Sequence, residues 1–177
     1  MKLLVINGTP RKFGRTGVIG NYISNQYNAD LIDLSEGSIP LYNGEEEQNE
    51  IPSVKQLRQL AYDADGVVLT SPEYHNAMSG ALKNALDFLG SAQFEHKPVA
   101  IIAVAGGGKG GINALSNMRT VARGIYANVI PKQLVLDPDR FDMENKQLTA
   151  QGEGQVDEVI KELQLYMKHS VQRSIRQ

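Results

Sequence analysis

The sequence predicts an α/β protein in which a parallel sheet is covered by helices on both faces. Short apolar runs rich in β-branched residues alternate with segments whose apolar residues recur every three to four positions, and this alternation is typical of parallel strands joined by helical crossovers. The strand-like runs are apolar throughout, as expected of strands that are buried on both faces. Right-handed crossovers between five such strands give a three-layer sandwich with strand order 2-1-3-4-5.

Each element follows from its local pattern. Apolar, β-branched runs predict strands at about residues 2–6, 30–34, 66–70, 98–104 and 133–136. Helix-period segments predict helices at about 16–27, 53–62, 79–89 and 112–124, and a last amphipathic helix that carries Val156, Val159, Ile160, Leu163 and Met167. Residues 36–50 are expected to form a loop, and residues 169–177 are expected to fray because they lack clear periodicity. This arrangement is flavodoxin-like, in one domain that spans residues 1–177.

Composition restricts the class of protein. The chain has 177 residues, a net charge of −2 and no cysteine. No basic surface for nucleic acid, no attraction to an anionic membrane and no disulfide is therefore expected, and no metal site is predicted. The apolar run at residues 3–6 is too short for a signal peptide or a membrane span, which favours a cytoplasmic protein.

A phosphate-binding loop is predicted after the first strand, between Gly8 and Thr16. The start of a helix offers unpaired N–H groups and partial positive charge. Thr9 and Thr16 add hydroxyl groups, while Arg11 and Arg15 add charge that suits a phosphate. The alternative is a Gly/Pro turn with solvated arginines and Thr16 as the N-cap. Phosphate binding is favoured because the donors coincide with the helix start.

Two further segments follow strand ends, where ligands bind in open α/β sheets. Residues 71–76 are polar and aromatic, and their backbone N–H groups could face a flat ring. Residues 106–111 match the spacing of the dinucleotide fingerprint, but that motif belongs to the first strand–helix turn. Its glycines are interpreted as allowing backbone to approach a planar ligand, with a connector that binds nothing as the alternative. One phosphate loop and two ring-binding segments indicate a mononucleotide, and FMN fits better than a dinucleotide.

The chain resembles the NADPH-dependent FMN reductase family, and it is especially similar to the azoreductase members. The resemblance covers nearly the whole chain and rests on Gly8-Thr9-Pro10-Arg11, residues 71–76, residues 79–87 and Gly106-Gly107-Gly108. It implies a flavodoxin-like fold, non-covalently bound FMN, and transfer of reducing equivalents from NAD(P)H to azo dyes, quinones or free flavin.

The resemblance also implies roles for the predicted site residues. By it, the phosphate is held by Thr9, Arg11, Arg15 and Thr16, the isoalloxazine is lined by Pro72, Glu73, Tyr74, His75 and Asn76, and the pyrimidine edge is approached by Gly106 and Gly107. Gly14 departs from the family pattern, since many relatives have a serine there, and this leaves the phosphate more dependent on the remaining donors.

No catalytic acid or nucleophile is required, because hydride chemistry belongs to the flavin. The predicted cycle is ping-pong: NADPH reduces bound FMN, the oxidised nucleotide leaves, and a small-molecule acceptor is reduced in the vacated slot. His75 could donate a proton to the product, although a loop histidine more often has a packing or hydrogen-bonding role. Glu73 could simply anchor its loop. Tyr74 could stack on the nicotinamide, cover the ring or lie in a subunit contact.

The helix predicted at 79–89 has more apolar residues than one core-facing stripe requires. The excess is interpreted as a homodimer or tetramer interface beside the flavin, with complete burial inside the monomer as the alternative. Lys83 could form an ion pair across this contact or be solvated. Arg15 and Lys109 are candidates for binding the 2′-phosphate of NADPH, and the sequence does not decide between NADPH and NADH.

Two other functions are compatible with the predicted fold. A flavodoxin would carry electrons without a nicotinamide reaction of its own, but typical flavodoxins are strongly acidic and have aromatic residues on both sides of the flavin. Here the net charge is only −2 and tryptophan is absent. A flavin-free regulator or interaction domain is also possible, because fold alone does not determine function.

Overall fold

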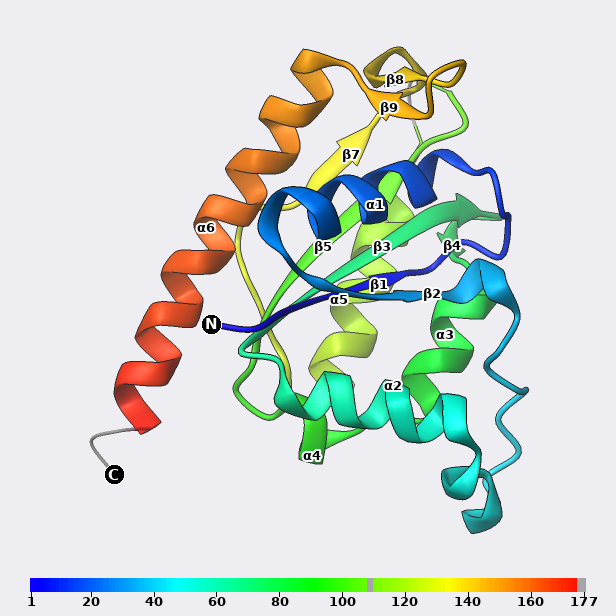
Figure 1. Cartoon of the computed structure of the whole chain (residues 1–177), viewed down its shortest axis with the longest axis vertical. Helices are drawn as coiled ribbons and strands as arrows, with labels where there is room; N and C mark the ends of the chain where they lie inside the picture. Colours follow the sequence, from blue (N-terminus) through cyan, green and yellow to red (C-terminus); the bar gives the residue numbers. More distant parts are fainter. Residues whose placement is uncertain (108–109, 175–177) are drawn as a thin grey trace.

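A parallel β-sheet forms the centre of the molecule in the computed structural model, which describes residues 1–107 and 110–174 (Figure 1). Its strands are β1 (Leu3–Asn7), β2 (Asp30–Asp33), β3 (Gly66–Tyr74), β5 (Pro98–Val104), β6 (Asn128–Val129) and β7 (Leu134–Leu136). The order is β2-β1-β3-β5-β6, and β7 also pairs with β5. The predicted order 2-1-3-4-5 is confirmed, with β7 as the predicted fifth strand beside the end of β5. The short strand β6, which was not predicted, pairs with the start of β5.

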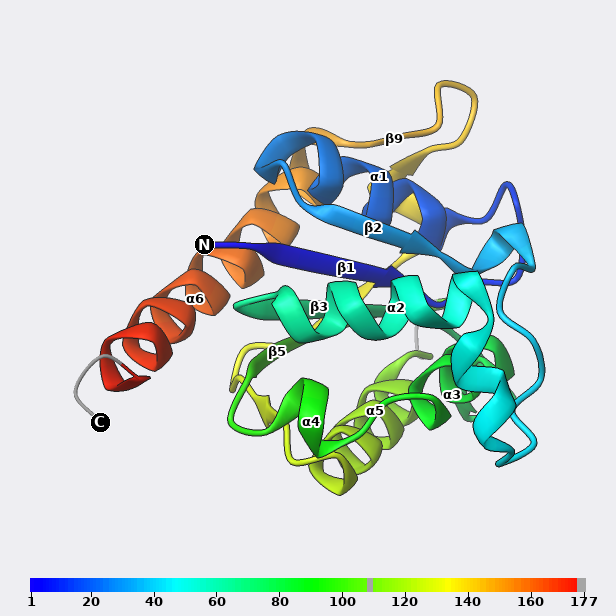
Figure 2. The ribbon, with the colours of Figure 1, turned by 60° about the horizontal axis from the view of Figure 1, so that its bottom comes forward.

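Helices cover both faces of the sheet, as predicted. Figure 2 shows α1 (Arg15–Tyr27) and α6 (Ala150–Ser174) on one face and α2 (Pro52–Asp63), α3 (Gly80–Asp87), α4 (Ser91–Phe94) and α5 (Ile112–Gly124) on the other. Alternation along β1 produces this division, because neighbouring side chains in a strand point to opposite faces. Leu4 and Ile6 belong to the core cluster under α2, α3 and α5, whereas Leu3 and Val5 belong to the cluster under α1 and α6.

The third strand is longer than predicted. The apolar run predicts a strand that ends at Thr70, but β3 continues through Tyr74 and includes Pro72, although proline is unusual inside a central strand. Pro72 pairs with Val104 of β5, and beyond it β3 pairs with the short antiparallel strand β4 (Ala77–Met78). His75 and Asn76 form the connecting turn, with φ of 49° and 62°. Positive φ at both central residues is typical of the tight turns that match the twist of a hairpin.

Several short elements were not predicted. A 3₁₀ turn at Leu34–Glu36 leads into the expected loop at 36–50, and a second one at Glu46–Glu50 ends it. After β7, a third 3₁₀ turn (Pro138–Arg140) leads into an antiparallel hairpin of β8 (Phe141–Asp142) and β9 (Gln147–Leu148). The helix α6 continues through Ser174, and residues 175–177, the end of the stretch expected to fray, lie outside the described residues.

The apolar residues of the helix predicted at 79–89 are buried within the monomer. Leu82, Ala85, Leu86, Phe88 and Leu89 are each at most 7% exposed and belong to the core under α2 and α5. The surplus apolar surface on which the expected interface rested is therefore used for internal packing. Lys83 forms an ion pair within its own helix, with 2.7 Å between its Nζ and Oδ1 of Asp87.

None of the described helices is long and apolar enough to cross a membrane.

Candidate functional site

The carboxyl ends of β1, β3 and β5 lie at the same edge of the sheet. Asn7 pairs with Thr70, and the next residues of β3, Ser71 and Pro72, pair with Ala103 and Val104. The three segments that the sequence singled out (residues 8–16, 71–76 and 106–111) therefore follow adjacent strands that end at one level. Gly108 and Lys109 of the third segment lie outside the described residues. This edge is where open α/β sheets bind their ligands.

A buried set of hydrogen bonds joins the first two segments. The Gly8 N–H donates to the carbonyl of Thr70 at 2.8 Å, and the Ser79 hydroxyl donates to the carbonyl of Gly8. The same Ser79 oxygen accepts the Leu82 N–H at 3.0 Å and so caps α3. The backbone that enters the predicted phosphate loop is thus fixed to both β3 and the start of α3. The cap follows the ordinary N-cap preference for serine before a helix. Sequence reasoning missed the bond from Ser79 to Gly8, because it joins residues that are far apart in the chain.

The predicted phosphate segment ends at a helix start that lacks a side-chain cap. Gly14 is the N-cap of α1, no side chain accepts from the first turn, and that turn contains no acidic residue. Thr9 and Thr16 are buried here, and the Thr9 hydroxyl oxygen accepts the Arg11 N–H at 3.2 Å. The side chain of Arg11 is exposed. This helix start therefore offers backbone donors and partial positive charge to an anion.

Arg15, the first residue of α1, carries the clearest sign of an absent partner. Its Nη1 is buried and is the only buried side-chain nitrogen or oxygen among the described residues that has no hydrogen-bond partner. Buried polar groups are nearly always hydrogen-bonded, and a charged donor without a partner is especially costly. Arg15 also lies near an aromatic ring, with 6.0 Å between its guanidinium carbon and the centroid of Phe141. The arrangement fits a phosphate bound at the start of α1.

The predicted ring-binding residues around the β3–β4 turn differ in their surroundings. Pro72 is buried, Tyr74 is partly buried, and His75 and Asn76 are exposed at the turn. Asn76 accepts from Nδ2 of Asn113 at 3.3 Å. These residues lie together beside the third segment.

Glu73 has a structural partner. Its Oε2 accepts the backbone N–H of Ala114 at 2.9 Å, in the first turn of α5. A carboxylate at this position satisfies a free helix N–H and interacts favourably with the helix dipole. This geometry matches the role of anchoring its loop.

The glycines of the third segment are of two kinds. A Cβ at Gly111 would lie 2.5 Å from the Val135 side chain, and its φ is 96°, so packing and backbone conformation both require glycine there. A Cβ at Gly106 or Gly107 would meet no atom within 4 Å, and both residues are exposed. Nothing in the described protein requires glycine at these two positions, and the backbone there is accessible to a ligand.

A separate groove of about 970 Å³ lies between α5, the β6 region and α6, with Arg119, Arg123 and Tyr166 among its lining residues. None of the predicted site residues lines it. The described residues hold no cluster of three or more His, Asp or Glu side chains that could bind a metal ion.

The chain is similar to known proteins along most of its length. Residues 1–140 match the family model for NADPH-dependent FMN reductase. The chain is 57% identical over 167 residues to an NADPH azoreductase of Bacillus sp. (strain OY1-2), with 94% of this chain and 93% of the relative covered. It is 31% identical over 153 residues to the FMN-dependent NADPH-azoreductase of Staphylococcus aureus (strain USA300), with 80% and 79% covered.

A solved structure supports the fold. The flavoenzyme NAD(P)H:(acceptor) oxidoreductase FerB from Paracoccus denitrificans superimposes with a TM-score of 0.72 at 20% sequence identity, over 93% of this chain and 98% of that chain. The flavodoxin-like three-layer arrangement predicted from the sequence is confirmed.

Proposed function

The chain belongs to the NADPH-dependent FMN reductase family, and from this premise we infer that it is an FMN-dependent NADPH oxidoreductase of the azoreductase type. The structural observation that carries the inference is the buried Nη1 of Arg15, which lacks a partner at the uncapped start of α1. The Arg15 guanidinium and the free N–H groups of the first turn of α1 are donors that suit a phosphate ester. FMN has one phosphate and one flat ring. When bound, FMN would supply the redox chemistry for ping-pong transfer of reducing equivalents from NADPH to an acceptor.

Arg15 and the first-turn N–H groups of α1 would hold the phosphate, with the hydroxyl groups of Thr9 and Thr16 beside them. Arg11, whose side chain is exposed, would add charge at the rim of this site. Arginine suits the role because its guanidinium offers several N–H donors in a planar arrangement. Ser79 would contribute indirectly by fixing the backbone of Gly8.

The ring would lie against Pro72, Tyr74, His75 and Asn76, with the backbone of Gly106 and Gly107 at its pyrimidine edge. Backbone N–H groups near Gly106 and Gly107 would stabilise negative charge that develops at this edge, as preorganised donors do in other active sites. Glu73 would hold the start of α5 in place beside them.

The acceptor class proposed for this chain is azo dyes, with quinones and free flavin as further small-molecule acceptors. We also propose self-association and a cytoplasmic location. The basis for self-association differs from the one expected, because the apolar residues of α3 are buried. Asn84 of α3 donates a hydrogen bond to the Pro40 carbonyl and accepts one from the Tyr42 N–H. Between these two residues Leu41 is 81% exposed, and this apolar side chain is the basis proposed for a contact with a second copy.

Reaction of the purified yellow holoprotein with NADPH under anaerobic conditions tests the function. We expect rapid bleaching of the visible flavin absorbance, and recovery of the colour when an azo dye or a quinone is added. A holoprotein that stays yellow with NADPH would instead be an electron carrier. A colourless protein whose unfolding temperature does not respond to FMN would contradict any flavin-dependent function.

A further inference from the structure

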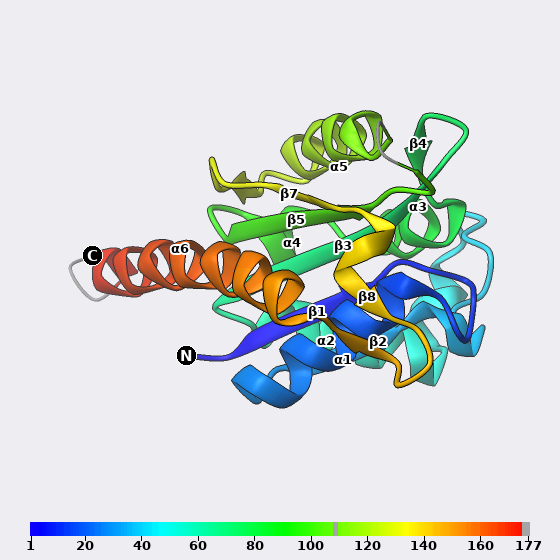
Figure 3. The same cartoon turned by 90° about the horizontal axis from the view of Figure 1, so that it is seen from above.

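The β8–β9 hairpin lies beside the predicted phosphate segment, although the two are far apart in the sequence. Figure 3 shows β8 next to the blue segment that leads into α1, and Figure 1 shows the same proximity from another side. The family match ends at residue 140, directly before this hairpin. Its role is therefore not assigned by family membership.

The hairpin contacts the phosphate segment at two points, and each contact pairs a cation with an aromatic ring. Phe141 of β8 lies 6.0 Å from the guanidinium carbon of Arg15, measured from the ring centroid. At the tip of the hairpin, Nζ of Lys146 lies 4.9 Å from the centroid of the Phe13 ring. Phe13 is 75% exposed, so solvent weakens the second contact, whereas Phe141 is only 8% exposed. Cation–π contacts are stronger where they are desolvated.

Core packing and hydrogen bonds within its turn fix the position of the hairpin. Leu148 of β9 and Phe141 are buried in the core cluster that includes Val18 and Ile19 of α1. In the turn, Oδ1 of Asp142 accepts the N–H groups of Glu144 and Asn145, both at 3.1 Å.

The base of the hairpin is also attached to α6. The Thr149 N–H donates to the Arg140 carbonyl at 2.9 Å, and a Cβ at Gly152 of α6 would lie 2.7 Å from that carbonyl oxygen. The Phe141 ring is therefore held in one position, where the flexible side chain of Arg15 can pack against it.

We infer that Phe141 is a positioning residue for the flavin phosphate, and that it acts by holding the Arg15 guanidinium at the start of α1. The inference rests on the proposed function, in which Arg15 binds the phosphate of FMN. Contact with a ring face occupies none of the guanidinium N–H groups, so Arg15 remains able to donate to an anion while its long side chain is restrained. Restraint before binding lowers the entropy lost on binding, which strengthens affinity without a direct contact to the ligand.

Comparison of FMN with riboflavin, which has the same ring and lacks the phosphate, isolates this effect. The full-length chain freed of flavin is titrated with each, and the quenching of flavin fluorescence gives two dissociation constants. In Phe141→Leu we expect FMN binding to weaken about three- to tenfold, corresponding to the range of cation–π contacts, while riboflavin binding is unchanged. Phe141→Tyr keeps the ring and should restore the ratio of the two constants to that of the wild type.

A double-mutant cycle tests whether the effect passes through Arg15. In an Arg15→Gln background, which should itself weaken FMN binding selectively, Phe141→Leu is expected to cause no further change in the ratio. Phe88→Leu is the matched control: it makes the same change at a buried phenylalanine in the other core cluster and should leave the ratio unchanged.

The possible outcomes separate the inference from the proposed function. Three results would overturn the role of Phe141 while leaving flavin binding by the wild type intact. In Phe141→Leu, the ratio of the FMN and riboflavin dissociation constants could stay unchanged, or both flavins could bind equally more weakly. In the Arg15→Gln background, Phe141→Leu could still change the ratio as much as it does in the wild type. A wild-type chain that binds neither flavin would overturn the proposed function and the inference together.

Discussion

Arg15 and Glu73 are charged side chains at the same edge of the sheet, and they differ in whether the protein satisfies them. Glu73 accepts the Ala114 N–H at 2.9 Å, whereas Nη1 of Arg15 is buried without a partner among the described residues. A satisfied carboxylate contributes to stability, and an unsatisfied donor indicates a ligand. Both residues were selected from the sequence as candidates for ligand binding, and only their surroundings in the fold distinguish them.

Replacement of Glu73 should therefore affect stability. In Glu73→Ala the first turn of α5 loses its acceptor, and we expect the free energy of unfolding to fall by about 1 kcal/mol, as for other lost helix caps. Glu73→Gln keeps an acceptor oxygen and loses only the charge at the helix start, so its effect should be smaller, about 0.3–1 kcal/mol. Urea unfolding of the flavin-free chain measures both. Glu47→Ala, at an exposed position, is the control, and equal stability of all three variants would rule out the anchoring role.

At the scale of elements, the junction of β1, β3 and α3 permits no side chain at residue 8. A Cβ on Gly8 would lie 2.4 Å from the Thr70 carbonyl oxygen and 2.8 Å from Cβ of Leu82. Both neighbours are held in place, since Thr70 is within the sheet and Leu82 lies in the first turn of a capped helix. The phosphate segment thus leaves β1 along a path set by its neighbours.

Gly8→Ala should push β1 away from β3 and α3, because the added methyl group has no room at this junction. We expect the free energy of unfolding to decrease by about 2–4 kcal/mol, a range typical of overpacking that the backbone must absorb. Gly80→Ala is the matched control, because Gly80 starts α3 and a Cβ there meets nothing within 4 Å. That variant should be neutral or gain up to about 1 kcal/mol from helix propensity. Urea unfolding tests the pair, and a Gly8→Ala variant as stable as Gly80→Ala would show that the junction can relax.

Two tyrosines of α1 attach that helix to α6. The hydroxyl groups of Tyr22 and Tyr27 both donate to Oδ1 of Asp157, at 2.9 and 2.6 Å. Burial raises the pKa of Tyr22 to about 12, with the hydrogen bond to Asp157 and its charge adding to the effect. The same causes raise the pKa of Tyr27. The folded protein therefore keeps both phenols protonated at a pH where the unfolded chain has begun to lose these protons.

The stability of the protein at alkaline pH should depend on the hydrogen bonds from Tyr22 and Tyr27 to Asp157. Because the folded pKa values lie above the ordinary value near 10, the stabilisation is complete below about pH 10 and is lost as the pH rises toward about 12. The double variant Tyr22→Phe/Tyr27→Phe should be less stable at pH 8, by about 0.5–1.5 kcal/mol for each hydrogen bond, and its stability should decline less between pH 10 and 12. Urea unfolding across this range tests the prediction, with Tyr126→Phe at an exposed position as the control. Parallel curves for the wild type and the double variant would contradict it.

Elements with a strong local pattern could be predicted from the sequence, and those defined by distant partners could not. The apolar run of β5 and the helix-period segment of α5 have the predicted bounds, Pro98–Val104 and Ile112–Gly124. The end of β3 was missed because its last residues pair with β4, which is too short to have a periodic signal. The two-residue strands β8 and β9 were missed for the same reason.

The same distinction applies to the candidate site. Its phosphate segment has a local signal, since polar donors and a helix start adjoin in the sequence. The contact between Arg15 and Phe141 has none, because it depends on where a hairpin near the end of the chain is placed. The burial of the apolar residues of α3 likewise depends on α2 and α5, so composition alone could not decide between an interface and a core.

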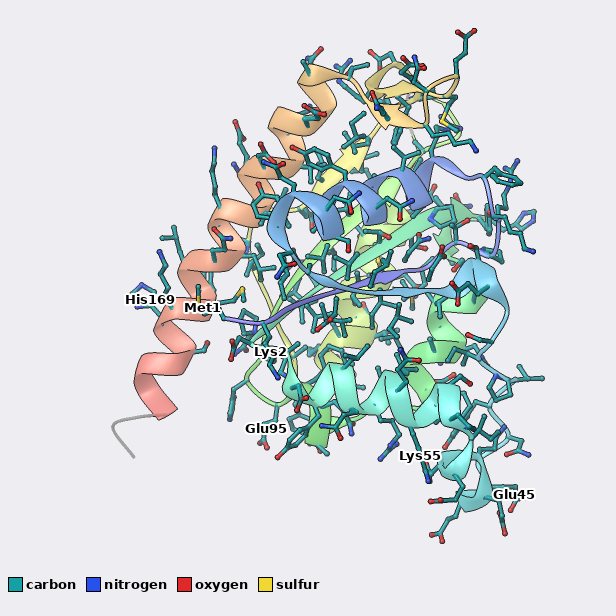
Figure 4. The ribbon with its side chains drawn as sticks, in the orientation of Figure 1. Met1, Lys2, Glu45, Lys55, Glu95 and His169 are labelled. Carbon is teal, nitrogen blue, oxygen red and sulfur yellow. The ribbon has the colours of Figure 1, made fainter. Side chains whose placement is uncertain are left out.

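At the scale of the whole molecule, charge is distributed so that an anionic ligand is not repelled. The net charge is −2, and an acidic stretch occupies Glu45–Glu50. Figure 4 shows Glu45 and Lys55 at the end of the molecule opposite the β8–β9 hairpin, which adjoins the phosphate segment. Charges separated by more than about 10 Å of solvent are largely screened at ordinary ionic strength. The local field at the start of α1 is therefore set by nearby groups, chiefly Arg11, Arg15 and the helix dipole.

FMN should stabilise the entire fold, because its proposed site joins the ends of β1, β3 and β5 and supplies the partner that Arg15 lacks. A ligand that binds only the folded state at 100 times its dissociation constant adds about 2.7 kcal/mol to the free energy of unfolding. For a chain of this length that corresponds to a rise of about 5–10 °C in the unfolding temperature. Riboflavin at the same concentration should produce a smaller rise, since it leaves the buried guanidinium unsatisfied. Thermal unfolding of the flavin-free chain with each compound measures the difference. Equal rises in unfolding temperature with FMN and riboflavin would contradict a phosphate site at the start of α1. No rise with either compound would contradict flavin binding at this edge of the sheet.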